Sequence, residues 1–299
     1  MNIFLDDSRC RETLFPFTHT RHVADIRVGI LTIRQKWEMI TGMAVTTSLS
    51  QKKENSIVIQ SHIIPSKNNA EQIIRAAKDK TPILENEEIR MLHHPWQIFQ
   101  YNDKALREDF ELITAGRISE NISATNQCTN AENVFIEEGA VVEYCFLNAS
   151  TGPIYIGKDA LLMEGNMIRG PFCAGENSVI KMGSKIYGAT SIGPFCVAGG
   201  EIKNSALFGY SNKAHDGYLG DSVIGEWCNL KNTGGEVKYI INSRMPSIAA
   251  GNKAGLLMGD YSRCAINTSF NTGTVVGVCC NIFGEMPGKY VNNFSWGNE

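Results

Sequence analysis

A six-residue spacing of aliphatic side chains constrains this chain more than any other feature of its sequence. Counted in steps of six, eight successive positions are aliphatic: Ile156, Leu162, Ile168, Ala174, Ile180, Ile186, Ile192 and Ala198. A helix repeats about every 3.6 residues and a strand about every two, so neither element explains the spacing. Short strands joined by corners explain it, because each repeated aliphatic then points into the core of a parallel β-helix.

The repeat returns later in the chain after an interruption. A second register and a short lead-in comprise Met258, Cys264, Phe270, Val276 and Ile282, with Ile136 and Val142 before the main run. Between the two runs lies SNKAHDGYLGDSVIGEW, residues 211–227, which contains His215. We interpret the start of this stretch, residues 211–217, as a loop that breaks the repeat so that His215 projects from the edge of a coil.

The first part of the chain predicts a different structure. NIFL is typical of a first strand, and a helix follows in which Ile30, Ile33, Trp37 and Ile40 share one face, with Asp25 as its cap and Gly42 at its end. Further strands are expected within residues 43–49 and 56–61, and further helices within 70–80 and 102–117. The chain is therefore predicted to be mainly β, with a small α/β domain at residues 1–122 and a β-helix at 123–299.

Composition excludes several classes of function. The net charge of −3, with both signs mixed, gives no basic stripe for nucleic acid. No apolar run reaches the roughly 18 residues of a membrane helix, and acids stand where a secretion signal would carry positive charge, which predicts a cytoplasmic protein. The nine cysteines form no CxxC pair, so they are expected to be reduced rather than bound to zinc or to each other.

Several motifs carry a family resemblance. KAHDGYLGDSVIGEW, residues 213–227, resembles the acetyltransferase half of the bifunctional N-acetylglucosamine-1-phosphate uridyltransferase/glucosamine-1-phosphate acetyltransferase family. ETLFPFTHTRHVADIRVGILTIRQKWE, HPWQIF, TGPIYIG and FNTGTVVGV resemble a divergent, sugar nucleotidyltransferase-like branch of that family with hexapeptide repeats. The resemblance implies three blocks per coil, left-handed coiling, a homotrimer, acetyl-coenzyme A as acetyl donor, and a place in UDP-N-acetylglucosamine biosynthesis.

The resemblance also implies a set of site residues for acetyl transfer. A sugar amine must be neutral to attack a thioester, so a group that titrates near neutrality has to take its proton. His215 matches the general base of the family, and Tyr218 and Lys203 match positions that contact the sugar phosphate. From the residues alone, Tyr218 is interpreted equally well as an aromatic that packs within the loop. Lys203 is better interpreted, from the residues alone, as a solvated surface charge.

A nucleotidyltransferase site is expected near the N-terminus. Such enzymes bind phosphates over a glycine-rich loop with a basic residue and hold Mg²⁺ with carboxylates. Arg11 and Arg21 are the candidate nucleotide-binding residues, and Asp6 and Asp7 the candidate metal ligands. The chain has no glycine before Gly29, and His22 follows Arg21 where relatives usually have proline, so both arginines are equally read as structural ion-pair residues.

Two further departures from the family concern the β-helix. After Trp227, CNL runs directly into KNTGGEVK, about half a coil shorter than the family pattern, and Asp260 stands where relatives often place a serine near the coenzyme.

The leading hypothesis is a sugar-nucleotide enzyme with nucleotidyltransferase and acetyltransferase character. The alternative is a catalytically reduced structural or regulatory paralogue on a trimeric β-helix. A hexapeptide-repeat zinc enzyme would need three histidines, and His215 is the only histidine after His94.

Overall fold

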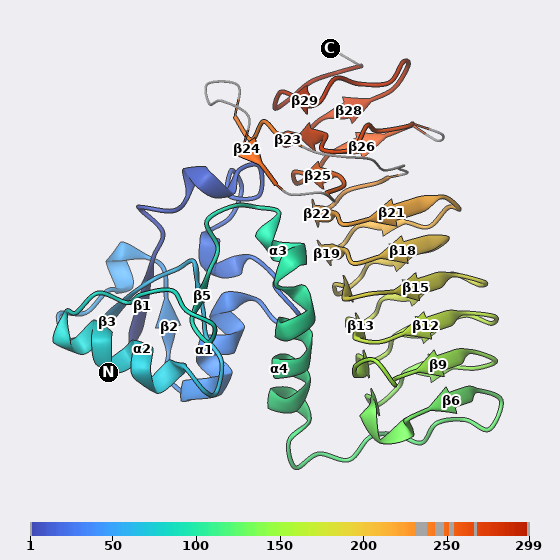
Figure 1. Ribbon diagram of the computed structural model, residues 1–299, viewed down its shortest axis with the longest axis horizontal. Coiled ribbons are helices and arrows are strands. Elements are labelled where there is room, and N and C mark those ends of the chain that lie inside the picture. The colour runs from blue at the N-terminus through green and yellow to red at the C-terminus, as the bar shows by residue number, and fades with distance from the viewer. Residues whose placement is uncertain (1, 231–237, 243–247, 251–253, 266–267, 298–299) are drawn as a thin grey trace.

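An α/β region and a parallel β-helix lie side by side in the structure (Figure 1). The computed structural model describes residues 2–230, 238–242, 248–250, 254–265 and 268–297. The predicted fold class is confirmed in both parts: the chain begins with a small α/β region and continues as a stack of parallel β-coils.

The α/β region is built on a three-stranded parallel sheet. Strand β1 (Ile3–Asp6) lies in the centre, between β2 (Val45–Thr46) and β3 (Ile57–Gln60). A separate antiparallel pair joins β4 (Ile63–Ile64) to β5 (Arg90–Met91). Because the chain order reverses at β1, the carboxyl ends of β1 and β3 flank the position where open α/β sheets bind ligands.

Four α-helices accompany these strands: α1 (Ile33–Thr41), α2 (Ala70–Asp79), α3 (Gln97–Gln100) and α4 (Asn102–Thr114). The predicted cap of the first helix, Asp25, is wrong. Thr32 caps α1 in a capping box with Gln35, because each side chain bonds the other residue's backbone N–H group, and Asp25 instead pairs with Arg34. Gly42 ends α1 at a φ of 64°, as the sequence predicts.

The β-helix has three faces, each a parallel sheet. Face 1 comprises β7 (Val134–Ile136), β10 (Ile154–Ile156), β13 (Phe172–Ala174), β16 (Thr190–Ile192), β19 (Ala206–Gly209), β22 (Val223–Glu226), β25 (Leu257–Met258), β27 (Val275–Val276) and β29 (Tyr290–Val291). Face 2 comprises β8 (Val141–Val142), β11 (Leu161–Leu162), β14 (Val179–Ile180), β17 (Val197–Ala198) and β20 (Asn212–Lys213), and farther along the paired β26 (Arg263–Cys264) and β28 (Asn281–Ile282). Face 3 comprises β6 (Gln127–Thr129), β9 (Phe146–Asn148), β12 (Met167–Arg169), β15 (Lys185–Tyr187), β18 (Glu201–Lys203) and β21 (Tyr218–Gly220). An antiparallel pair, β23 (Lys238–Tyr239) and β24 (Ile248–Ala249), lies outside these faces.

Strand pairing confirms that the six-residue repeat builds the coils. Ile156 pairs with Ala174, which pairs with Ile192, so one coil takes three blocks of six. All eight aliphatics of the main run are at most 2% exposed. Their side chains form the continuous interior core that the spacing predicts.

The interruption of the repeat has a different cause from the predicted loop. Ile192 pairs with Leu207, so this coil is shorter than the coils before it, and its corner between faces 2 and 3 consists only of Gly199 and Gly200. The corner that contains His215 spans residues 214–217, the same length as corners 163–166 and 181–184. The register therefore shifts because one coil is shortened, while the His215 corner keeps its ordinary length.

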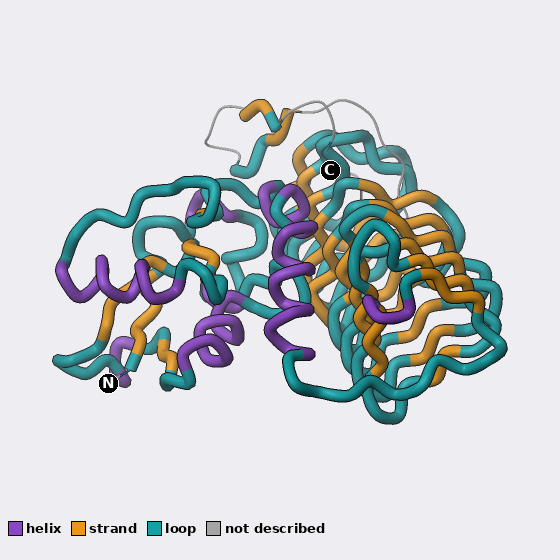
Figure 2. Tube along the Cα trace, turned by 60° about the horizontal axis from the view of Figure 1, so that its bottom comes forward, coloured by secondary structure: helices purple, strands orange, loops and turns teal. Residues whose placement is uncertain are grey.

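The α/β region packs on face 1 of the β-helix. Phe208 and Val223 from face 1 belong to the same buried cluster as Phe17 and Trp37 of the α/β region. Helix α4 runs along the β-helix (Figure 2), and its Leu106 packs near Cys173 and Ala189. The chain passes from α4 to the first coil strand between residues 114 and 127, and we propose residue 122 as the boundary.

One edge of the β-helix carries a stack of half-exposed aromatic rings. Phe195, Tyr210, Trp227 and Tyr261 occupy successive corners with neighbouring ring planes within 4° of parallel. Each has a positive φ, and the same corner holds residues better suited to that conformation in earlier coils, such as Asn177. Ring stacking therefore offsets a backbone cost along this edge.

No helix in the described part of the chain is long and apolar enough to cross a membrane. Most of the nine cysteines are buried, and Cys279 is exposed.

Candidate functional site

His215 lies at the corner between faces 2 and 3, on top of a glycine corner. A Cβ atom on Gly199 would stand 2.4 Å from the carbonyl oxygen of Ala214, and one on Gly200 would stand 2.9 Å from that of Gly217. These distances leave no room for side chains, so the two glycines let the corner of residues 214–217 settle directly on the shorter coil below. The His215 side chain remains exposed at this corner.

Lys213 fixes the backbone of the His215 corner from inside the β-helix. It pairs with Ala198 on face 2, in the column of inward positions that Leu162 and Ile180 fill lower down. Its side chain is fully buried, and its ammonium group donates hydrogen bonds to the carbonyl oxygens of Gly199, at 2.8 Å, and His215, at 2.6 Å. A buried cation needs such acceptors, so Lys213 ties the two corners together.

Lys203 and Tyr218 lie on neighbouring strands of face 3, directly after the His215 corner. Strand β18 pairs with β21, with Glu201 opposite Tyr218 and Lys203 opposite Gly220. Ile202 and Leu219 between them are buried, so the alternating side chains lie on the outer face. The structure therefore brings both predicted substrate-binding residues to the face that begins at His215.

The environment of Tyr218 keeps its phenol protonated. Burial, with Asp221 and Glu201 nearby, raises the pKa of Tyr218. A Cβ on Gly220 would stand 2.1 Å from the Tyr218 hydroxyl oxygen, so the phenol lies along its own strand over this glycine. The ammonium of Lys203 stands 5.8 Å from the ring centre of Tyr187, whose hydroxyl donates to Glu201 at 2.6 Å. Tyr218 can thus donate a hydrogen bond, and Lys203 supplies positive charge to this face.

At the carboxyl end of β1, Asp7 forms the centre of an ionic cluster. Arg11 donates to one of its oxygens at 2.9 Å, and His22 Nε2 lies 3.3 Å from the other. His22 Nδ1 accepts a hydrogen bond from the backbone of Ala24, and burial lowers the pKa of His22. A neutral imidazole with its proton on Nε2 is compatible with both contacts, since Nδ1 accepts and Nε2 lies toward the Asp7 carboxylate.

The two predicted metal ligands do not form a preorganised Mg²⁺ site. Both oxygens of Asp7 face Arg11, His22 or the backbone N–H group of Val23, and one oxygen of Asp6 accepts from the backbone of Ser8. No group of three or more metal-ligating side chains occurs among the described residues. A divalent cation at Asp7 would have to displace an arginine and a histidine, so an Mg²⁺ site at Asp6 and Asp7 stays a prediction that requires these contacts to open.

Arg21 lies in the contact between the α/β region and the β-helix. Its guanidinium group pairs with Asp260 and, at 3.3 Å, with Glu226, and it stacks over the ring of Phe208 at 4.9 Å. Thr20 donates to the same Asp260 oxygen, and the other oxygen accepts the backbone N–H group of Glu226 at 2.8 Å. These contacts agree with the interpretation of Arg21 as a structural ion-pair residue. They also engage both carboxylate oxygens of Asp260.

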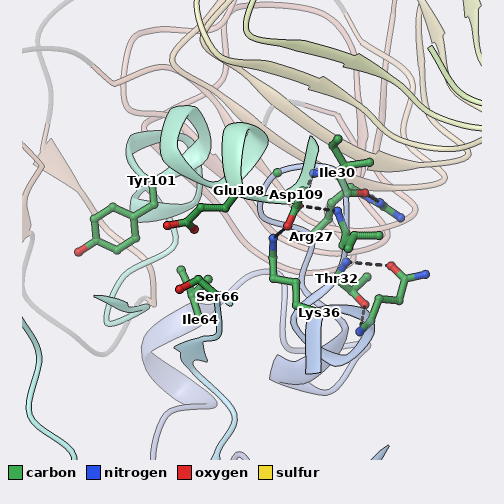
Figure 3. Close-up of polar contacts among 12 residues, drawn as sticks. Arg27, Ile30, Thr32, Lys36, Ile64, Ser66, Tyr101, Glu108 and Asp109 are labelled. Atoms are coloured by element: carbon green, nitrogen blue, oxygen red, sulfur yellow. Dashed lines mark hydrogen bonds and ion pairs between the residues drawn. The ribbon is translucent and has the colours of Figure 1, made fainter. Parts of the chain in front are cut away.

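A buried polar network, absent from our sequence predictions, connects α4 to the α/β region. Asp109 of α4 pairs with Lys36 of α1 and accepts the backbone N–H group of Ile30 at 2.8 Å (Figure 3). Burial lowers the pKa of Lys36 and raises that of Asp109, while their contact opposes both shifts. About two turns earlier, Asn102 donates to the carbonyl of Ala189 on the β-helix at 2.8 Å. This helix therefore joins the two regions through satisfied polar contacts.

Part of the predicted difference from the family falls beyond these observations. The stretch KNTGGEVK after Leu230 is nearly all in residues 231–237, which lie outside the described residues.

Comparison with known proteins finds a family model that matches the first part of the chain. The sequence model of the family described as sugar nucleotidyl transferase matches residues 2–87 and 44–118. The chain therefore has a sugar nucleotidyltransferase-like α/β region, followed by a parallel β-solenoid.

Similarity to particular proteins extends farther along the chain. The chain is 24% identical over 276 residues to the bifunctional protein GlmU of Methanococcus maripaludis strain C5, and the match covers 85% of this chain and 59% of the relative. It is 29% identical over 203 residues to the bifunctional protein GlmU of Methanocaldococcus jannaschii, covering 62% of this chain and 41% of the relative. The chain thus spans about three fifths or less of the length of these curated relatives and is distantly similar to them.

Proposed function

We propose that the protein transfers an acetyl group from acetyl-coenzyme A to the amine of a hexosamine 1-phosphate, with His215 as general base. The observation that carries the proposal is the placement of His215, Lys203 and Tyr218 at one corner and on the adjoining face, with Lys213 fixing the corner backbone. Similarity to proteins named GlmU over most of the chain supports it.

In the proposed reaction, the neutral imidazole of His215 takes a proton from the sugar amine as its nitrogen bonds to the thioester carbonyl carbon. The carbon–sulfur bond then breaks, and the thiolate leaves as free coenzyme A after protonation. Lys203 binds the phosphate of the sugar, because an ammonium group suits an anion. Tyr218 donates a hydrogen bond to the sugar or its phosphate.

A groove on the same face suits the acetyl donor. It has a volume of about 550 Å³ and is lined by Phe146, Met167, Arg169, Lys185 and Tyr187, among others. Tyr187 pairs with Lys203 on the next strand, so the groove continues from the proposed sugar site. Its apolar residues suit the pantetheine chain of coenzyme A, and Arg169 and Lys185 suit its phosphates.

We further propose that the protein acts as a cytoplasmic homotrimer. The α/β region packs on face 1, whereas the outer side of face 2 carries a row of aliphatic residues, of which the first is exposed and the others are partly exposed: Val141, Leu161, Val179 and Val197. A second copy packed on face 2 would stand next to His215. Light scattering tests this proposal: three times the chain mass of 33.0 kDa supports it, and monomer at micromolar concentration contradicts it.

A second function, that of a regulatory or structural paralogue, is favoured for the α/β region by one observation. Asp7 is engaged by Arg11 and His22, and Arg21 by Asp260, so three of the four predicted nucleotidyltransferase residues are held in ion pairs within the chain. Nucleotidyl transfer at Asp6, Asp7, Arg11 and Arg21 therefore stays a prediction that requires these pairs to open.

One experiment separates the two functions. The full chain is incubated with acetyl-coenzyme A and glucosamine 1-phosphate, and the product is identified by its mass. An acetylated sugar phosphate supports the enzyme. Absence of product, with the protein folded and trimeric, supports the noncatalytic paralogue.

A further inference from the structure

A lysine and an aspartate meet in the protein interior where α4 packs against α1. Lys36 is 1% exposed and Asp109 is 2% exposed, and the ammonium group of Lys36 contacts Oδ1 of Asp109. Figure 3 shows the two side chains pointing toward one another from the two helices. The proposed acetyl transfer uses neither residue. The pair therefore places an amine and a carboxyl group in fixed contact away from water.

The second oxygen of Asp109 lies in a cradle of backbone N–H groups. Oδ2 accepts hydrogen bonds from Ile30 at 2.8 Å and from Leu31 at 3.1 Å. Gly29 permits this approach, because it has a φ of 85° and a Cβ atom there would stand 2.5 Å from Oδ2 and 2.9 Å from the carbonyl oxygen of Ala105. Two N–H groups that point at one oxygen stabilise negative charge that develops on it.

Burial favours the uncharged forms of both groups. Desolvation lowers the pKa of Lys36 and raises the pKa of Asp109, against the effect of their mutual contact. Transfer of one proton from the nitrogen to Oδ1 gives a neutral amine, which is nucleophilic, and a neutral carboxyl group. A fixed contact of this kind replaces a bimolecular encounter and corresponds to an effective concentration of up to about 10⁵–10⁸ M.

We propose that Lys36 and Asp109 condense in the folded protein to an amide (isopeptide) bond between Nζ and Cγ, with loss of one water molecule. Nζ gives one proton to Oδ1 and bonds to Cγ, and negative charge moves to Oδ2, next to the N–H groups of Ile30 and Leu31. Nζ then gives a second proton to Oδ1, the Cγ–Oδ1 bond breaks, and water leaves. The nitrogen keeps one hydrogen, so the step needs no co-reactant.

The interior also favours the product. In bulk water the separate ions are stabilised by hydration, whereas a buried ion pair keeps a desolvation cost that a neutral amide does not have. The amide oxygen retains the hydrogen bonds from Ile30 and Leu31. The bond would tie α1 to α4, the helix whose Asn102 contacts the β-helix. The proposal concerns covalent structure and does not depend on acetyl transfer at His215.

Mass spectrometry of the purified full chain under denaturing conditions tests the proposal. We expect a mass below that of the sequence by one water molecule. Trypsin does not cleave after an amidated lysine, so the digest should contain a branched peptide that joins residues 35–52 to residues 108–117. A mass equal to that of the sequence, with these two segments recovered as separate peptides, would overturn the proposal.

Two variants assign the bond to this pair. Lys36→Met removes the nucleophile, so this variant should have the full mass of its own sequence. Lys104→Met is the matched control, because it breaks the exposed pair of Lys104 and Glu108, whose atoms are 3.9 Å apart, and should still show the loss of water. Loss of water in Lys36→Met would overturn the assignment. If Lys36→Met does not fold, fragmentation of the wild-type branched peptide decides the assignment, because it identifies the two linked residues directly.

Discussion

The ammonium group of Lys213 donates a hydrogen bond to the backbone carbonyl oxygen of His215, 2.6 Å away, from a fully buried position. The same group bonds the carbonyl oxygen of Gly199 in the coil below. A lysine in an inward column of the β-helix thus orders the backbone on which a proposed catalytic histidine stands.

Replacement of this lysine should destabilise the protein and impair acetyl transfer together. Lys213→Met retains the stem of the side chain but leaves the carbonyls of Gly199 and His215 without their donor, at a cost of about 1–3 kcal/mol. Urea denaturation measures the loss of stability, and the rate of thiol release from acetyl-coenzyme A in the presence of glucosamine 1-phosphate measures acetyl transfer. Unchanged stability would show that these hydrogen bonds do not hold the corner.

The contact between Arg21 and Asp260 should contribute strongly to docking of the α/β region on the β-helix. Asp260→Asn keeps the shape of the side chain but leaves a buried guanidinium without its main carboxylate, so we expect a loss of about 3 kcal/mol in the free energy of unfolding. Glu71→Gln is the matched control, since it breaks the exposed pair of Arg75 and Glu71 and should cost less than about 0.5 kcal/mol. Similar losses in the two variants would contradict a structural role for Arg21.

His62 should make the stability of the protein depend on pH. Burial and the neighbouring His93 lower the pKa of His62 to about 4, while Glu85 opposes the shift. The unfolded chain takes up this proton near pH 6.5, so the contribution is fully present above that pH and is lost as pH falls toward 4. Between pH 7 and pH 5 it should remove about 2 kcal/mol of stability.

The His62→Gln variant isolates this contribution from those of other histidines. Urea denaturation of wild type and variant at pH 7, 6 and 5 should show a shallower loss of stability in the variant. Parallel curves for the two proteins would show that His62 does not titrate in this way.

The β-helix could be predicted from the sequence because every coil imposes the same local requirement. Ile156, Ala174 and Ile192 each fill an inward position at a fixed spacing, so the pattern is repeated enough to be read without tertiary information. The cause of the interruption could not be read in this way. A shifted register results equally from a coil that loses residues and from a loop that gains them, and only the pairing of Ile192 with Leu207 shows which occurred.

The candidate site was predictable only where its residues are close in sequence. His215 and Tyr218 belong to one motif, and Lys203 lies one coil earlier, so the repeat brings them to one edge. Arg21 and Asp260 are 239 positions apart, and their pairing depends on how the α/β region packs on face 1. The sequence carried a signal for the buried position of Lys213, because this lysine stands in a column of inward positions otherwise filled by aliphatic residues.

The central claim is that His215 acts as the general base, and the most direct test compares rates of thiol release from acetyl-coenzyme A with glucosamine 1-phosphate. His215→Ala should reduce the rate by roughly 10²–10⁴-fold with the fold intact, since the side chain is exposed. Glu164→Ala, at the equivalent position of the corner formed by residues 163–166, should leave the rate unchanged. Equal rates in wild type and His215→Ala would contradict the account.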